Sequence, residues 1–346
     1  MLPWGLEVAR SLGIYSAAFL TNSAAVCSIF RQVDRGRMRL PVAAEELPVS
    51  LPGIPPLGAE EMPTFLVQAS NPYLEAVMEM FALMDQNDFI FANSFDMLEN
   101  EVAKAMLGQW PVKMVGPSVP SAFLHDNLNS DTDYGSSHDR LPEGDAATAD
   151  WLNAKSPKSV VYISFGSMAQ ISAVQLEQIA DGLIESGSTF LWVVREPEHR
   201  FLLRTRLDRG AAEGMLVPWC NQVEVLMHES VGCFLTHCGW NSTLEAISFG
   251  VPVVAMPQWS DQPLNAKFVD EVWGVGVRVG RGRGEGGVVG KEEVKRCVEE
   301  VMKGEEYRKN ALKWRDLAKD AMRKIKKMLV AMAMADLLLS SNLTQR

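Results

Sequence analysis

The sequence predicts an α/β protein with parallel sheets, on two observations. Short apolar runs typical of buried strands alternate along the chain with segments of helical composition, and this alternation favours parallel sheets. A polar stretch divides these elements into two groups, and 346 residues, 47% of them hydrophobic, are enough for two cores. Ligands of such sheets bind beyond the carboxyl ends of the strands, so the residues that follow each strand are the candidates for a site.

The first group of elements occupies residues 1–124. Its predicted strands and helices are Ala17–Leu20, Phe89–Ala92, Val112–Val115, Asn71–Met84 and Glu99–Leu107. The proline-rich span Leu47–Phe65 is expected to be a surface loop. Residues 125–147 are rich in Asp, Asn, Ser and Gly, with few apolar side chains, which predicts an exposed linker.

The second group occupies residues 148–323. The strand-forming run Ser159–Ser167 ends in a Gly-Ser turn, and a predicted helix, Ala173–Glu185, follows it. The remaining predicted elements are Phe190–Val194, Met215–Val217, Gly232–Thr236, a helix from Trp240, Val275–Val279 and Lys291–Met302. Residues 324–346 form a separate tail, in which a basic run precedes the apolar Met328–Leu339. This segment is shorter than the roughly 20 residues that span a bilayer, which leaves a helix on a membrane surface, a helix packed on the protein or a read-through product.

Composition narrows the possible partners. The net charge of −10 argues against binding to nucleic acid or to an anionic membrane. Five cysteines form an odd count without framework spacing, which indicates reduced thiols and a cytoplasmic location. Cys233 and Cys238 lack the second pair that a zinc site needs, so no metal and no resident cofactor are expected. We also expect a monomer.

The segment Trp219–Gln262 is the richest in candidate site residues. The predicted strand Gly232–Thr236 turns through His237 into a helix, and a helix N-terminus attracts anions. His237, Asn241 and Ser242 can therefore donate to a pyrophosphate. Glu245 follows Asn241 by four residues and lies on the same helix face, where it could accept hydrogen bonds from ribose hydroxyls.

Both ends of this segment also carry suitable side chains. The indole of Trp219 follows a predicted strand, where it could stack on a base, and Asp261 with Gln262 could bond sugar hydroxyls. Taken singly, such residues are more often a helix cap, a core tryptophan or a structural histidine. The whole set at these spacings, together with the Gly166-Ser167 turn, indicates a site for a nucleotide sugar.

All 44 positions of this segment resemble the signature of the plant family 1 UDP-glycosyltransferases. The resemblance implies the GT-B architecture, with two Rossmann-like domains facing a cleft and the N-terminal one incomplete. It implies an acceptor-side domain at 1–124, a linker at 125–147 and a donor-binding domain at 148–323. Further matches after Asp261 resemble the branch that acts on phenolics, flavonoids and carboxylate hormones.

The resemblance also implies a role for each matching residue. The expected contacts are Trp219 on uracil, the Cys220 backbone on the uracil edge, Gln222 and Glu245 on ribose, His237, Asn241, Ser242, Ser167 and the Trp240 backbone on phosphates, and Asp261 and Gln262 on the sugar. Gln262 combined with Trp240 is similar to the glucose-preferring pattern of the family.

The implied activity is an inverting transfer of glucose from UDP-glucose, a co-substrate, to a hydroxyl or carboxyl group of a small acceptor. The family's catalytic His and Asp correspond to positions upstream of Met1, so the resemblance assigns no catalytic residue within this sequence. The alternative is a truncated, catalytically inactive protein that still binds a UDP-sugar.

Overall fold

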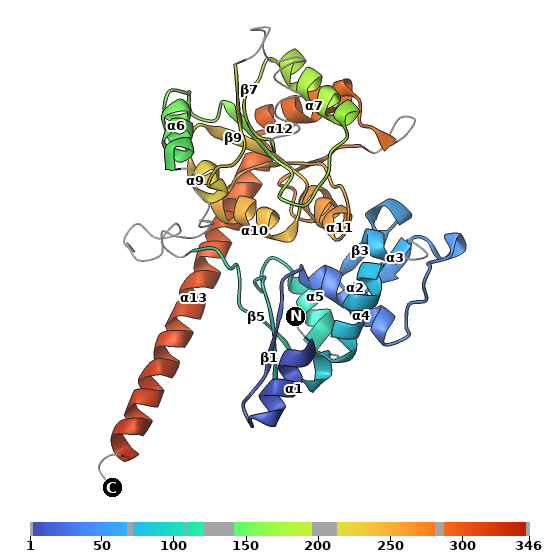
Figure 1. Cartoon of the computed structure of the whole chain (residues 1–346), viewed down its shortest axis with the longest axis vertical. Coiled ribbons are helices and arrows are strands. Elements are labelled where there is room, and N and C mark those ends of the chain that lie inside the picture. The colour runs from blue at the N-terminus through green and yellow to red at the C-terminus, as the bar shows by residue number, and fades with distance from the viewer. Residues whose placement is uncertain are drawn as a thin grey trace.

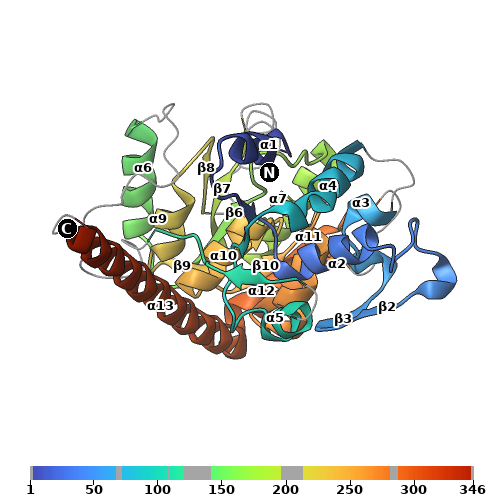
Figure 2. The same cartoon turned by 90° about the horizontal axis from the view of Figure 1, so that it is seen from below.

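The structure, a computed structural model, describes residues 3–67, 72–107, 110–120, 142–195, 213–280 and 287–343. Two α/β units lie one above the other in Figure 1, with the later part of the chain in the upper unit. The long helix α13 (Glu305–Leu343) descends from the upper unit past the lower one. Seen from below, α13 and the helix α3 (Thr64–Val67) lie on opposite sides of the molecule (Figure 2).

The N-terminal unit is built on a three-stranded parallel sheet in the order β1-β4-β5. Its strands are β1 (Ala17–Leu20), β4 (Phe89–Ala92) and β5 (Val112–Met114). An antiparallel hairpin adds β2 (Val49–Leu51) and β3 (Ile54–Leu57). The other helices of this unit are α1 (Pro3–Ser11), α2 (Ala24–Asp34), α4 (Pro72–Ala82) and α5 (Asn100–Leu107).

The C-terminal unit is built on a six-stranded parallel sheet in the order β11-β10-β9-β6-β7-β8. The strands are β6 (Val160–Ser164), β7 (Thr189–Val193), β8 (Gly214–Val217), β9 (Val231–Thr236), β10 (Val253–Ala255) and β11 (Gly276–Arg278). The helices are α6 (Pro142–Asn153), α7 (Ala173–Ser186), α9 (Gln222–Met227), α10 (Trp240–Phe249), α11 (Gln262–Lys267), a π-helical turn (Phe268–Val272), α12 (Lys291–Lys303) and α13.

The strand order places a topological switch point between β6 and β9. The chain proceeds outward from β6 to β8 and then returns to the other side of β6, which is the doubly wound Rossmann order. At the carboxyl ends of these two central strands, Ser164 lies in register with Thr236. The turns that follow them therefore emerge side by side, where α/β sheets bind their ligands.

Alternation along the central strands explains why both faces of this sheet are covered. In β6, Val160 and Tyr162 belong to one buried cluster, which extends to α10 and α13. Val161 and Ile163 belong to a second cluster, which includes residues of α7 and α12. A strand buried on both faces appears in sequence as a continuous apolar run, which is why β6 and β9 could be predicted.

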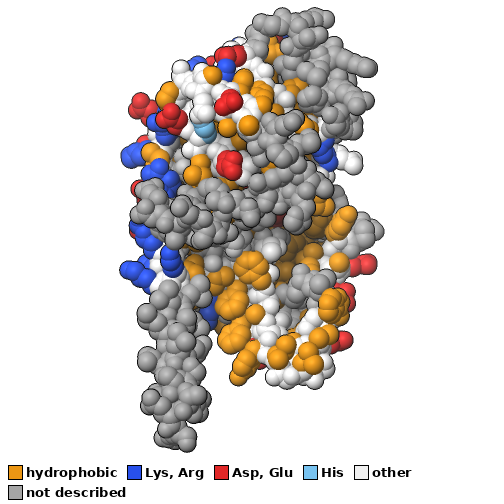
Figure 3. Space-filling model, turned by 60° about the vertical axis from the view of Figure 1, so that its left-hand side comes forward, with side chains coloured by type: hydrophobic (Ala, Val, Ile, Leu, Met, Phe, Trp, Pro, Cys, Tyr) orange, Lys and Arg blue, Asp and Glu red, His pale blue; other side chains and the backbone are white. Residues whose placement is uncertain are grey.

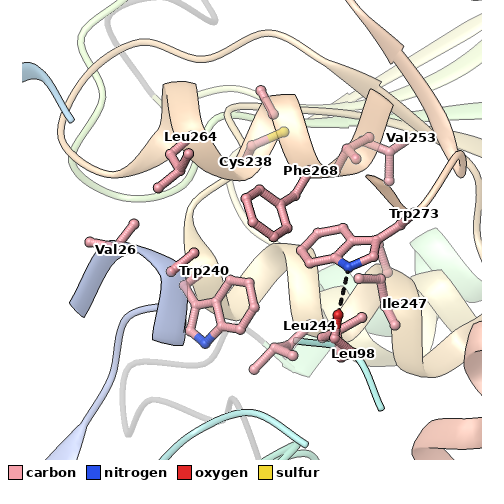
Figure 4. Close-up of a cluster of buried hydrophobic side chains, with 14 of the residues drawn as sticks. Val26, Leu98, Cys238, Trp240, Leu244, Ile247, Val253, Leu264, Phe268 and Trp273 are labelled. Carbon is pink, nitrogen blue, oxygen red and sulfur yellow. Dashed lines mark hydrogen bonds between the residues drawn. The ribbon is translucent and has the colours of Figure 1, made fainter. Parts of the chain in front are cut away.

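Tryptophans join the two units. The indole nitrogen of Trp273 donates to the Leu98 carbonyl (3.0 Å), and that of Trp240 donates to the Asn93 carbonyl (2.7 Å). Figure 4 shows Trp273 bonded to Leu98 among side chains from both units, with Val26 of α2 facing Leu264 of α11. One hydrophobic cluster therefore runs from the N-terminal unit into the C-terminal one.

One expectation about connecting segments needs correction, and two predicted boundaries fall on helices. The span Leu47–Phe65 contains the hairpin β2-β3 and buries Leu57 and Met62, because its apolar side chains turn toward the core despite the prolines. The predicted linker overlaps α6, which begins at Pro142, while residues 121–141 lie outside the described residues. The expected boundary at 323/324 lies inside the continuous helix α13.

Three findings concern membrane-spanning helices, the cysteines and metal sites. No helix among the described residues is long and apolar enough to cross a membrane. All five cysteines are buried and unpaired by disulfides, and burial raises the pKa of Cys233 and Cys297 to about 12. The thiols of Cys233 and Cys297 are therefore protonated at neutral pH. In the described ranges, no group of three His, Cys, Asp or Glu side chains is arranged to hold a metal ion.

Candidate nucleotide-sugar site

The turns after β6 and β9 meet at the switch point around the ring of His237. Gly166 has φ +71°, and a Cβ there would lie 2.8 Å from the Nε2 atom of His237. A Cβ on Gly239 would lie 2.5 Å from the same atom. The two glycines are needed because larger residues would displace the imidazole. The ring is thus held between the two turns that are expected to receive phosphates.

Burial keeps His237 neutral. It lowers the pKa of this imidazole from 6.5 to about 4, against a smaller opposing effect of a hydrogen bond to the Ser164 backbone. Its Nδ1 atom also lies 3.3 Å from the Thr236 hydroxyl. A neutral ring has a single N–H, so His237 can orient a phosphate by hydrogen bonding but contributes no full positive charge.

The helix α10 begins at the switch point with its N-terminus open. Gly239 is the N-cap residue, and no side chain caps the helix. The first backbone N–H groups of such a helix have no intrahelical partner, so they are available to an anion. Asn241 is exposed in this first turn, whereas Ser242 is buried beneath it. The predicted phosphate contacts His237, Asn241 and Ser242 therefore cluster at one helix start.

The predicted ribose residues are joined by direct hydrogen bonds. The Gln222 amide nitrogen donates to the Glu245 carboxylate (2.6 Å) and lies 2.9 Å from the Ser242 hydroxyl. Its amide oxygen accepts from the Tyr162 hydroxyl at 3.2 Å, and burial raises the pKa of Tyr162 well above 10. Because Glu245 is buried one turn below the phosphate end of α10, an ordered carboxylate is available to paired hydroxyls.

The predicted base-binding residues lie at the start of α9. Trp219 follows β8 and is 37% exposed, unlike most tryptophans of the chain, so its indole has a face available for stacking. Cys220 is buried next to it, with its sulfur 3.5 Å from the Tyr162 hydroxyl. The same tyrosine thus contacts both Cys220 and Gln222, and joins a predicted base contact to a predicted ribose contact.

The predicted sugar residues, Asp261 and Gln262, lie where the loop after β10 (residues 256–261), which we call the sugar loop, meets the start of α11. The Gln262 amide oxygen accepts from the backbone N–H groups of Gln258 (2.8 Å) and Trp259 (3.0 Å). Gln262 is therefore oriented to offer its amide N–H groups to a ligand. Asp261 accepts from the Asn265 amide (2.7 Å), and burial raises the pKa of its carboxyl while this hydrogen bond opposes the rise.

The N-terminal unit holds this sugar loop in place. The Thr64 backbone N–H donates to the Ser260 carbonyl (2.9 Å), and the Ser260 N–H donates to the Thr64 hydroxyl (2.8 Å). Ser260 has φ +61°, an uncommon conformation for a residue with a side chain. The paired bonds across the units stabilise that conformation and fix the chain just before Asp261.

Trp240, for which a backbone contact with phosphate is predicted, has a side chain that packs between the two units. The indole of Trp240 is buried against Asn93 and Trp273. Its backbone N–H still lies in the first turn of α10, as the phosphate role requires. Any influence of Trp240 on the choice of sugar must therefore act through packing between the units.

Three supporting residues were not predicted from the sequence. Tyr162 holds Gln222, and Asn265 holds Asp261, while the Arg195 guanidinium donates to the carbonyl of Ser167 (2.9 Å). Ser167 itself is exposed in its turn. Only Asn265 left a sequence signal, because four residues after Asp261 is the spacing of neighbours on a helix. The other two are distant in sequence from the groups they hold.

Two α/β units facing each other, with turns suited to a nucleotide on the second, match the GT-B architecture of glycosyltransferases. A family model for UDP-glucoronosyl and UDP-glucosyl transferase matches residues 98–330. UDP-glycosyltransferase 74E2 of Arabidopsis thaliana is 44% identical over 329 residues, which cover 93% of this chain and 72% of that protein. The chain belongs to the UDP-glycosyltransferase family, as the sequence predicted.

Solved structures of plant relatives agree with this assignment. Os79 from O. sativa in complex with UDP has a TM-score of 0.84 and 39% identity, over 95% of this chain and 76% of that one. Phytolacca americana UGT2, complexed with UDP-2fluoro-glucose and pterostilbene, has a TM-score of 0.78 and 31% identity. The match covers 96% of this chain and 74% of that one. The predicted GT-B fold is confirmed, and this chain spans about 72% of the curated relative's length.

Proposed function

We propose that this protein transfers glucose from UDP-glucose to a hydroxyl or carboxyl group of a small molecule. The observation that carries the proposal is the bonded group of Gln222, Ser242 and Glu245 beside the open N-terminus of α10. Ribose hydroxyls need an ordered hydrogen-bond acceptor, and Glu245 is one. Phosphates need donors without a partner, and the N-terminus of the same helix, about one turn away, offers backbone N–H groups. The comparisons favour this function over the alternative of an inactive UDP-sugar-binding protein.

Each part of the donor has a candidate partner in this proposal. Trp219 stacks on uracil and the Cys220 backbone bonds its edge, while Gln222 and Glu245 bind ribose. His237, Asn241, Ser242, Ser167 and the Trp240 backbone bind the phosphates, and Asp261 and Gln262 bind glucose. Support for these roles comes from the position of every one of them on the carboxyl side of the sheet or the helix that follows it.

The acceptor is proposed by class only. Phytolacca americana UGT2 was solved with pterostilbene, a finding about that protein that supports a phenolic acceptor here. A flavonoid or a carboxylate is the further possibility raised by the sequence. The proposal also includes a monomer and a cytoplasmic location. The location is supported by five buried cysteines outside any disulfide, which suit a reducing compartment.

The first test measures donor binding and turnover on the full chain. Calorimetry with UDP, UDP-glucose and ADP-glucose should show binding of the two uridine nucleotides and much weaker binding of the adenine one. A product assay with UDP-glucose and a panel of phenolic, flavonoid and carboxylate acceptors then assigns the acceptor class. Folded protein that binds no UDP at millimolar concentration would contradict the proposal.

A ribose-specific variant sharpens the test. Glu245→Gln should weaken UDP binding by about tenfold, because a charged acceptor of a hydrogen bond becomes a neutral one. The same substitution should cost less affinity for 2′-deoxy-UDP, which lacks one of the hydroxyls. Glu229→Gln, an exposed residue after α9, is the matched control and should leave both affinities unchanged. Equal losses for both nucleotides would place Glu245 away from the ribose.

A further inference from the structure

A single buried amide links three segments around the sugar loop. Asn265 in α11 is 1% exposed. Its Nδ2 atom donates to the Asp261 carboxylate at 2.7 Å and to the Cys238 carbonyl at 3.0 Å, and its Oδ1 atom accepts from the Ser23 hydroxyl at 3.1 Å. Asn265 therefore contacts three groups at once: Asp261, which is proposed to bind the sugar, the turn at Cys238 before α10, which we call the phosphate turn, and Ser23 of the N-terminal unit.

The bond to Asp261 favours the ionised form of that carboxylate. Asp261 is buried, and burial raises the pKa of its carboxyl, whereas the Asn265 hydrogen bond stabilises the charged form. An ionised carboxylate in such a place needs a donor to remain charged and in one orientation. Asn265 supplies that donor from the same helix, one turn further on.

The bond to Cys238 supports an uncommon backbone conformation. Cys238 has φ +62°, which residues with a side chain seldom adopt, and such conformations persist where surrounding contacts fix them. Asn265 donates to the carbonyl of this residue, directly before Gly239 and the open start of α10. The same amide thus links the geometry of the phosphate turn to that of the Asp261 carboxylate.

The third partner, Ser23, is itself held firmly by the N-terminal unit. It is the N-cap of α2, and its hydroxyl oxygen accepts from the Val26 N–H at 3.3 Å. The buried Glu99 carboxylate accepts from the next two backbone N–H groups, those of Ala24 (2.9 Å) and Ala25 (2.8 Å). Figure 4 shows the beginning of α2, with Val26, lying next to Leu264 of α11.

We propose that Asn265 is a positioning residue, which orients Asp261 for the donor sugar and, through Ser23, makes that orientation depend on the docked N-terminal unit. The inference rests on the proposed function, since it takes Asp261 to bind glucose. The affinity for the sugar would then depend on the N-terminal unit through Ser23 and Asn265, although neither side chain is proposed to touch the donor.

The test is the ratio of the affinities for UDP-glucose and UDP, measured by calorimetry on the full chain. UDP lacks the sugar, so a merely structural loss weakens both ligands equally and leaves the ratio unchanged. Asn265→Asp keeps the size and the acceptor for Ser23 but removes the donor to Asp261, and should lower the ratio by about tenfold. Ser23→Ala should lower it by about threefold, and Ser23→Thr, which keeps the hydroxyl, should restore it.

Asp261→Asn separates the two possible failures. If this variant leaves the ratio unchanged, Asp261 does not bind the sugar, and both the proposed role and the inference are wrong. If it lowers the ratio while Asn265→Asp and Ser23→Ala do not, the inference alone is overturned. Should Asn265→Asp fail to fold, as judged by circular dichroism, the pair Ser23→Ala and Ser23→Thr decides the question.

Discussion

The two units of this protein differ in how completely their sheets are covered. In the C-terminal unit, β6 and β9 are flanked by strands on both sides and packed by helices on both faces. In the N-terminal unit, β1 lies at the sheet edge, and Phe19 of β1 and Phe89 of β4 are 43% and 46% exposed. Figure 3 shows hydrophobic side chains gathered on the surface of this lower unit.

The difference indicates which unit depends on the other. The six-stranded sheet has a core of its own beneath α7 and α12, separate from the cluster that crosses between units. The three-stranded sheet shares its core with α10 and α11 through Trp240 and Trp273. We therefore expect the donor side to be the more stable part, and the N-terminal unit to be held in place largely by the interface.

Breaking the interface should give the largest effect. Trp273→Ala removes a buried indole and its bond to Leu98, and should destabilise the protein by about 3–5 kcal/mol, as is typical of buried Trp→Ala changes. Urea unfolding measures the loss. Hydrogen exchange should then accelerate in β1, β4 and β5 more than in β6 and β9.

Two controls accompany this substitution. Trp4→Ala changes an exposed tryptophan and should alter stability by no more than about 0.5 kcal/mol. Trp273→Phe keeps most of the packing but loses the donor to the Leu98 carbonyl, so its cost should be intermediate. Uniform acceleration of exchange in both sheets would contradict the idea that one unit depends on the other.

A pH titration tests how tightly His237 is packed within the C-terminal unit. The pKa of His237 is about 4 in the fold and 6.5 in an unfolded chain, so between these values only the unfolded chain takes up the proton. The stability associated with neutral His237 is thus complete above pH 6.5 and lost as the pH falls toward 4. Relative to His237→Gln, the wild type should lose up to about 3 kcal/mol more over that range.

Urea unfolding at pH 7, 6, 5 and 4.5 measures this difference. Glutamine cannot titrate, so any pH dependence that remains in the variant belongs to other groups. Parallel curves for the two proteins would mean that the ring is accessible to protons in the folded state, and that the glycine turns hold it less tightly than their geometry indicates.

A substitution at the base position should change binding without changing the fold. Trp219→Ala should weaken UDP binding by about 1–3 kcal/mol, by analogy with the stacking of bases on aromatic side chains. Because Trp219 is partly exposed at a strand end, its loss should hardly affect unfolding. Trp219→Phe, which keeps a ring, is the control. Equal affinities for all three proteins, measured by calorimetry, would show that the base binds elsewhere.

The smallest expected effect concerns the choice of sugar. The proposed contacts of Gln262 should favour UDP-glucose over UDP-galactose by about 1–3 kcal/mol, since the epimeric 4-hydroxyl would leave a buried polar group unpaired. Gln262→Ala should reduce this preference, whereas Gln258→Ala, in the same loop, should preserve it. Competition binding with both nucleotides decides the matter, and equal affinities in the wild type would exclude discrimination at the binding step.

Local sequence was sufficient to predict an element where a residue's neighbours in the chain are also its neighbours in the fold. The strand β9, the turn at His237 and the helix α10 are contiguous, so their apolar and helix-start patterns predicted these elements and marked the turn as the proposed phosphate site. The hairpin within Leu47–Phe65 was missed because its prolines masked the alternation that marks a strand.

The sequence by itself determined the family, the α/β class and the identity of the candidate donor residues, because these depend on side-chain type and on spacing within one segment. Only the tertiary structure decided what holds those residues. Ser23 meets Asn265 across 242 positions, and Trp240 meets the Asn93 carbonyl across 147. Hydrogen bonds between such distant positions depend on how the two units pack together, and no periodicity in the sequence predicts them.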